Sequence, residues 1–247
     1  LVGSEMCIRD STLSNGPRVF VQRIDIKGNA TTLDKVIRRQ FKVVEGDPFN
    51  PREIRQSAER IKALGYFAQV KVEPREGSSP NQVIVDVSVV ERPTGSLGFG
   101  GTYASTTGLG AEISFEEANF LGRGQAIGVA VSTAQTKKKL AFSFRDPAFL
   151  GRNLSAGLEL GYVSYTYDNV SFNSSATSFS PSVGFPLTDS SALNLSYSIS
   201  TSKVASGLTA STAVSGIIKD EIKKGDVLNS SIGYRYTYCL LYTSPSP

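Results

Sequence analysis

The sequence predicts an α+β domain in residues 17–93, followed by antiparallel, membrane-spanning β-strands in residues 94–238. The first prediction rests on two amphipathic helical segments that lie between strand-like segments. The second rests on repeated alternation of apolar and small polar residues over about ten residues at a time. Composition separates the regions, because 24 of 77 residues are charged in the first and 21 of 145 in the second. This contrast indicates that the two regions lie in different solvents.

The α+β domain is expected to have the element order β-α-α-β-β, with both helices on one face of a three-stranded sheet. Its strands are predicted over Val19–Lys27, Phe67–Pro74 and Gln82–Glu91. The second helix has the clearest limits. Asn50 can cap its first turn, Pro51 suits the first helical position, and Gly65 suits the position after its end.

The edges of this small sheet allow two interpretations. An exposed strand edge can receive an extended peptide as an additional strand. Alternatively, the domain is a plain scaffold whose edges bind nothing. Composition does not distinguish these two interpretations.

Eight segments of the second region alternate in strand fashion. They are Leu97–Tyr103, Ala111–Phe115, Ile127–Val131, Leu140–Phe144, Leu154–Tyr162, Phe179–Phe185, Leu193–Ile199 and Leu228–Tyr236. A soluble β-sandwich also alternates, but here the polar face is mostly Gly, Ser and Thr and offers little apolar surface to a second sheet. Aromatic residues at the strand ends also suit the two interfaces of a membrane. Lipid-facing strands are therefore the preferred interpretation.

A short repeat fixes the expected sidedness of these strands. Phe120-Leu121-Gly122-Arg123 recurs as Phe149-Leu150-Gly151-Arg152, 29 residues later. This distance fits two strands with their turns, so both copies are expected on the same side of the membrane. Since the small domain precedes the first strand, that side is expected to be the periplasmic one. Links on the other side are expected at 136–139, 168–175 and the partly helical 204–226, with Lys137–Lys139 in a solvated loop.

Composition argues against most enzymes and against a nucleic-acid partner. The 247 residues include no His, which removes the commonest general base and metal ligand, and the net charge is only +4. No nucleophile elbow or phosphate-binding loop occurs. We expect no catalytic residue, no metal site and no cofactor.

The two ends match neither region. Residues 1–16 and 239–247 are expected to be non-native and derived from sequencing adapters, with an ordinary disordered terminus as the alternative. On the first interpretation Cys7, Cys239 and Met6 are not native, and no disulfide joins the two cysteines. The natural protein would then continue beyond both ends.

Several motifs in order resemble one family. Leu64-Gly65-Tyr66-Phe67, Glu91-Arg92-Pro93-Thr94-Gly95-Ser96, Gly98-Phe99-Gly100-Gly101-Thr102-Tyr103 and Asn119-Phe120-Leu121-Gly122-Arg123-Gly124 resemble segments of the BamA family of outer-membrane protein assembly factors. The resemblance implies a polypeptide-transport-associated (POTRA) domain in the periplasm at 17–93 and about eight of an expected 16 outer-membrane barrel strands at 94–238. A closed eight-stranded barrel is the structural alternative.

The resemblance also implies a function and partners. It implies insertion of nascent outer-membrane proteins into the membrane, aided by accessory lipoproteins such as BamD and in contact with outer-membrane lipids. Client strands are expected to pair with the first barrel strand, at Gly95, Ser96, Leu97, Gly98, Phe99 and Gly100. Glycines there weaken cross-strand packing, or else simply relieve crowding. Glu45 aligns with the residue that engages the lipoprotein, or is a solvated loop carboxylate.

Two other functions stay open at this point. One is a passive outer-membrane pore or receptor, in which Glu112, Glu116 and Arg145 set the conductance. The other is a two-partner-secretion transporter.

Overall fold

The computed structural model describes residues 18–166, 172–188, 190–206 and 215–239. The chain divides into two compact units, one with residues 1–30 and 37–91 and one with residues 31–36 and 92–247. The end expected at 1–16 lies outside the described residues, and so does the other end except for Cys239.

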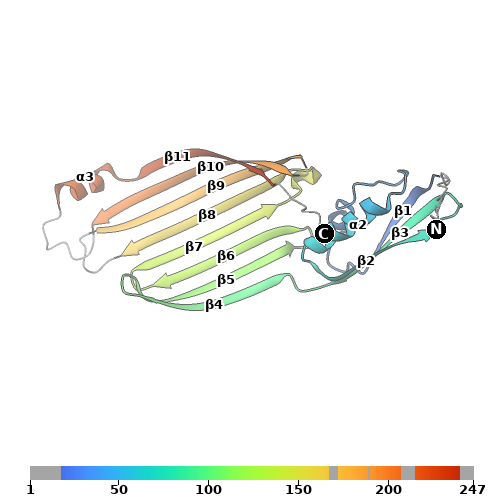
Figure 1. The fold of residues 1–247 in the computed structure, drawn as a ribbon. Helices are drawn as coiled ribbons and strands as arrows, with labels where there is room; N and C mark the ends of the chain where they lie inside the picture. The colour runs from blue at the N-terminus through green and yellow to red at the C-terminus, as the bar shows by residue number, and fades with distance from the viewer. Residues whose placement is uncertain (1–17, 167–171, 189, 207–214, 240–247) are drawn as a thin grey trace, which may run out of the picture. The chain divides into compact units, whose positions relative to one another are not determined.

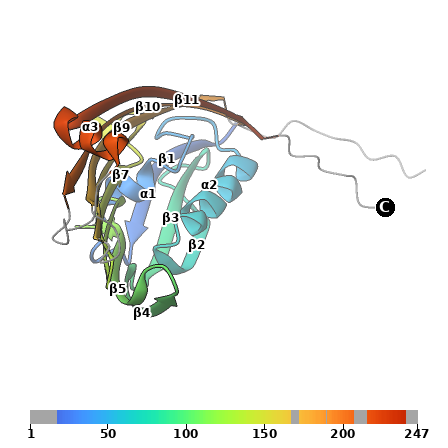
Figure 2. The ribbon, with the colours of Figure 1, turned by 90° about the vertical axis from the view of Figure 1, so that its left-hand side faces the viewer.

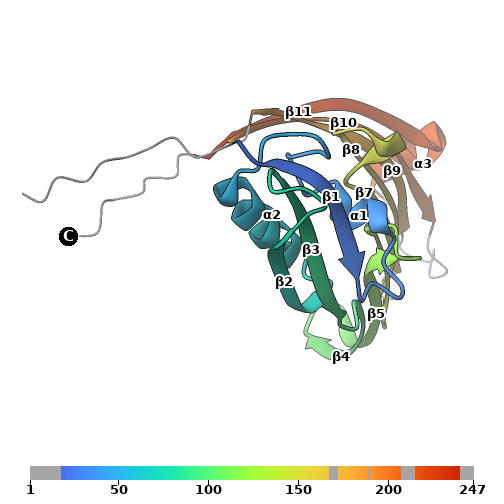
Figure 3. The same ribbon diagram turned by 90° about the vertical axis from the view of Figure 1, so that its right-hand side faces the viewer.

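The first unit has the predicted order β-α-α-β-β (Figures 1 and 3). Its elements are β1 (Phe20–Lys27), the end of α1 (Asp34–Arg38), α2 (Pro51–Ala63), β2 (Phe67–Glu76) and β3 (Gln82–Glu91). Residues 34–36 of α1 belong to the second unit. β3 lies in the centre of the sheet, parallel to β1 and antiparallel to β2. The prediction of an α+β domain is confirmed.

Helix α2 has the predicted ends. The side chain of Asn50 accepts a hydrogen bond from the backbone N–H of Arg52 at 3.0 Å, and Gly65 has a φ of +76° just after the helix. The apolar stripe of the helix faces the sheet, where Ile61, Val85 and Val87 are completely buried. Burying such side chains contributes about 1.5–3 kcal/mol each and stabilises the unit.

The second unit contains the eight predicted strands. They are β4 (Gly95–Ala104), β5 (Gly108–Phe120), β6 (Gln125–Ala134), β7 (Lys137–Asp146), β8 (Ser155–Thr166), β9 (Phe172–Thr188), β10 (Ser191–Ser206) and β11 (Val227–Tyr238). Each strand pairs antiparallel with its neighbour in sequence. The sheet curves (Figure 2), but β4 and β11 are its two edges and do not pair with each other. The alternative of a closed eight-stranded barrel is therefore wrong for this chain.

The links opposite the repeated turns differ in part from the prediction. Lys137–Lys139 belong to β7 and not to a loop, because their backbone continues the ladders with β6 and β8. A short helix, α3 (Gly216–Lys224), lies in the link expected to be partly helical. Residues 167–171 of another link lie outside the described residues. Within the described part of the chain, no helix has both the length and the apolar character needed to cross a membrane.

The two faces of the curved sheet carry different side chains. Large apolar residues such as Phe99, Ile113 and Leu140 are exposed on the convex face. On the concave face, glycines lie directly opposite serines of the neighbouring strand, and a Cβ at such a glycine would lie only 2.4–2.7 Å from the serine oxygen. These pairs are Gly98–Ser114, Gly128–Ser143, Gly157–Ser182, Gly161–Ser178, Gly184–Ser155 and Gly233–Ser196. Each serine therefore occupies the space that a second side chain would need.

The repeated turns share an unusual backbone. Leu121 and Leu150 have φ values of 53° and 55°, and Gly122 and Gly151 have values of 68° and 72°. The surroundings differ. A Cβ at Gly122 would lie 1.9 Å from the carbonyl oxygen of Thr31, whose segment belongs to the same unit, whereas a Cβ at Gly151 would meet nothing within 4 Å.

This contrast predicts different costs for two equivalent substitutions. Gly151→Ala should lower the free energy of unfolding by about 1–2 kcal/mol, because alanine is strained at positive φ. Gly122→Ala should cost at least twice as much, because it also displaces residues 31–33. Urea unfolding of the chain in detergent micelles, followed by circular dichroism, measures both. Equal losses would contradict the close packing at Gly122.

Candidate functional site

The six residues expected to pair with a client all lie in β4, an edge strand. Gly95 to Ala104 pair with Gly108 to Glu117 of β5 without any register shift. The other side of β4 has no strand partner among the described residues, so its outward N–H and C=O groups form an open edge. Leu97 and Phe99 project from the convex face, whereas Ser96, Gly98 and Gly100 lie on the concave one.

The glycines of β4 fall into two groups. A Cβ at Gly95 would lie 2.8 Å from a carboxylate oxygen of Glu117, and one at Gly98 would lie 2.6 Å from the Ser114 hydroxyl. Glycine relieves crowding at these two positions. A Cβ at Gly100 would meet nothing within 4 Å, and at Gly101 it would only touch the Gly110 carbonyl at 4.0 Å. The second half of β4 is therefore the thinly packed part.

The beginning of β4 is held by a carboxylate that the sequence did not single out. Glu117 accepts a hydrogen bond from the hydroxyl of Thr94, and also one from the backbone N–H of Asn119 at 2.8 Å. Asn119 in turn donates from its side chain to Thr32 at 2.8 Å and accepts from the Gly124 N–H at 2.7 Å. Motif spacing predicts only a turn at Asn119.

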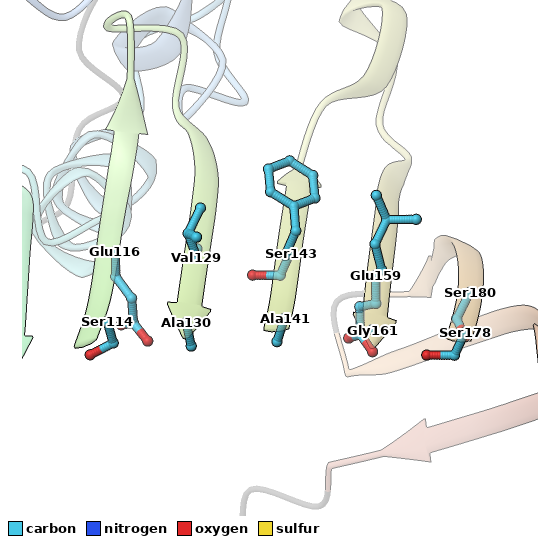
Figure 4. Close-up of a pocket in the computed structure, with 13 residues that line it drawn as sticks. Ser114, Glu116, Val129, Ala130, Ala141, Ser143, Glu159, Gly161, Ser178 and Ser180 are labelled. Carbon is cyan, nitrogen blue, oxygen red and sulfur yellow. The ribbon is translucent and has the colours of Figure 1, made fainter. Parts of the chain in front are cut away.

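The concave face is polar and contains two carboxylates in one row. Glu116 pairs with Gly128, Gly128 with Ser143, and Ser143 with Glu159, so both glutamates lie at the same level of the sheet (Figure 4). Serines of the neighbouring strands surround them. In the described part of the chain, no group of three or more His, Cys, Asp or Glu residues could hold a metal ion.

Glu45, the expected lipoprotein contact, lies in the first unit. One oxygen of its carboxylate accepts hydrogen bonds from the Ile24 N–H at 3.3 Å and from Arg38 at 3.1 Å. About half of its side chain is nevertheless exposed to solvent. Arg38 is the neighbour that sequence reasoning missed, because it lies at the end of α1, seven positions before Glu45 in the chain.

The two edges of the small sheet are not equivalent. The segment around Gly46–Phe49 covers the beginning of the outer edge of β1, through hydrogen bonds of 2.7–2.9 Å with Val21 and with Val19 just before the strand. The outer edge of β2 has no strand partner among the described residues. Near the end of β2, Arg75 donates to Asp86 of β3 at 2.7 Å, and this hydrogen bond lowers the pKa of the Asp86 carboxyl.

Family comparisons assign both regions. Residues 19–92 match the POTRA family, described as a surface antigen variable number repeat, and residues 119–241 match the Omp85 superfamily domain. The outer membrane protein assembly factor BamA of Neisseria meningitidis is 32% identical over 147 residues, which cover 59% of this chain and 18% of that protein. BamA of Neorickettsia risticii is 31% identical over 185 residues, or 74% of this chain and 25% of that protein.

Two solved structures have the same fold. The crystal structure of BamA from Haemophilus ducreyi lacking POTRA domains 1–3 matches with a TM-score of 0.69 and 20% identity, covering 94% of this chain and 46% of that one. CdiB from Escherichia coli matches with a TM-score of 0.55 and 16% identity, covering 91% and 43%. The chain thus spans less than half of each of these proteins. Residues 19–92 are a POTRA domain and residues 119–241 an Omp85 superfamily domain, so the chain belongs to the Omp85 superfamily.

Proposed function

We propose that this chain is part of a machine that assembles β-barrel proteins and inserts them into the bacterial outer membrane, with its POTRA domain in the periplasm. The open edge of β4, in a sheet whose convex face is apolar, is the observation that carries the proposal. The curated relatives that are named outer membrane protein assembly factors support it.

The mechanism that we propose is strand templating. In lipid, each unsatisfied backbone N–H or C=O costs several kcal/mol, because no water replaces the missing partner. A client strand that pairs with Gly95–Gly100 satisfies its own groups and those of β4 together. No bond is made or broken, so the activity needs neither a catalytic residue nor a cofactor.

The POTRA domain is proposed to receive client segments before they reach the membrane. Its open β2 edge suits an extended peptide, which would add as a fourth strand. Glu45 is proposed to contact an accessory lipoprotein of the BamD kind, since its carboxylate keeps an exposed portion beside Arg38.

A passive pore or a two-partner-secretion transporter is the second candidate. The fold similarity to CdiB and the charged residues Glu112, Glu116 and Arg145 on the concave face favour it. For a pore, this candidate function predicts an ionic conductance that depends on these charges. If it is correct, depletion of the protein leaves the levels of other outer-membrane proteins unchanged, whereas depletion of an assembly factor lowers the levels of many of them together.

A cysteine in β4 should form a disulfide with a stalled client. We introduce Ser96→Cys into the full-length protein without other cysteines. We expect it to crosslink to a cysteine in the terminal strand of a client at least tenfold more than Ser143→Cys does. Ser143 is the matched control, because it lies on the same concave face but in β7, which is paired on both sides. Gly98→Cys is a poorer probe, since its Cβ would meet the Ser114 hydroxyl. Gel electrophoresis under non-reducing conditions measures the yield, and equal yields at both positions would remove β4 from the mechanism.

Reversing the charge of Glu45 should weaken the lipoprotein complex. Glu45→Lys also breaks the ion pair with Arg38, so the double variant Arg38→Glu/Glu45→Lys, which restores that pair, separates the two effects. We expect co-purification of the lipoprotein to fall at least fivefold in both variants and to be unchanged in Glu59→Lys, a similar charge reversal on α2. Recovery of the complex in the double variant would show that Glu45 acts only within the domain.

A further inference from the structure

The convex face of the sheet has a sharp chemical boundary near the ends of β6–β10 that lie away from the repeated turns. Directly paired residues form rows across these strands. One row is Val129, Phe142, Leu160, Phe179 and Ile199. Four residues further from the repeated turns on each strand, the row is Thr133, Lys138, Ser164, Ser175 and Lys203. The surface thus changes from wholly apolar to hydroxyl and ammonium groups within about 14 Å.

Lys138 is the distinctive residue of this polar row. It shares the convex face with Leu140 and Phe142, because alternate residues of a strand point to the same side. Lys139, next to it in the chain, lies on the concave face with Ala141. Both lysines are exposed.

Among the residues that the structure describes, the charge of Lys138 is also unbalanced. Lys203, in the same row, forms an ion pair with Asp226 at 3.5 Å. Lys137 lies over the ring of Tyr165, 5.3 Å from its centroid. Among the described residues, Lys138 has no carboxylate within ion-pair distance. Its neighbours in the row, Thr133 and Ser164, bring only hydroxyl groups.

An exposed ammonium group at the border of an apolar surface suits one kind of partner. A lysine stem can lie along hydrocarbon while its charged end reaches the headgroup layer, where lipid phosphates carry negative charge. We infer that Lys138 binds the phosphate of an anionic lipid headgroup. This inference rests on the membrane placement in the proposed function, and it adds a lipid contact on the convex face that is independent of client pairing.

The absence of tryptophan from the chain allows a direct test. Tyr162, which pairs with Leu140 one row below Lys138, can be replaced by tryptophan, which is then the sole tryptophan and can be excited selectively. The chain is folded into vesicles of phosphatidylcholine and phosphatidylglycerol, and quenching by the dibrominated form of each lipid gives their relative binding constant. We expect a preference for phosphatidylglycerol that falls about fivefold in Lys138→Gln.

Two further variants make the test specific. Lys139→Gln removes the same charge from the concave face and should leave the preference unchanged. Lys138→Arg keeps the charge and should retain the preference. Equal losses in Lys138→Gln and Lys139→Gln, or no loss in either, would overturn the inference while leaving the proposed function intact. If neither brominated lipid quenched the reporter, the convex face would not lie in lipid, and both proposals would fail.

Discussion

The curvature of the eight-stranded sheet depends on how little space its inner face leaves for side chains. On a concave surface, side chains of neighbouring strands converge, whereas on the convex side they diverge. The directly opposed glycine and serine residues meet this constraint, because a serine hydroxyl lies within 2.4–2.7 Å of the place where each glycine would carry a Cβ. Most large apolar residues consequently lie on the outside. This distribution of small residues on the inner face and large apolar residues on the outer face bends the sheet. It therefore also separates a lipid-compatible surface from a polar one.

Much of this architecture follows from local sequence pattern. Alternation located all eight strands, and the residues around α2 fixed its two ends. Alternation predicts strand ends less well where the strands extend beyond the apolar rows of the convex face. Lys137–Lys139 resembled a loop for that reason, although the ladder of β7 includes them. A strand needs a partner for its backbone but needs apolar side chains only where lipid surrounds it.

The parts of the site that sequence did not predict are contacts over long separations. Asn119 and Thr32 are 87 residues apart, and their hydrogen bond depends on where the first repeated turn meets residues 31–36 of the same unit. The two roles of glycine in β4 likewise depend on register, since Glu117 and Ser114 fill the space beside Gly95 and Gly98 but nothing fills it beside Gly100. Only the pairing of β4 with β5 distinguishes these positions.

The covered outer edge of β1 limits what the small sheet can do. Hydrogen bonds from the segment around Gly46–Phe49 occupy the beginning of that side, and Ile24 further along it bonds to the side chains of Glu45 and Arg38. A sheet with two open sides could link one molecule to the next and grow into a fibre. Because β1 is covered at its beginning, the β2 side is the one to which an extended peptide adds.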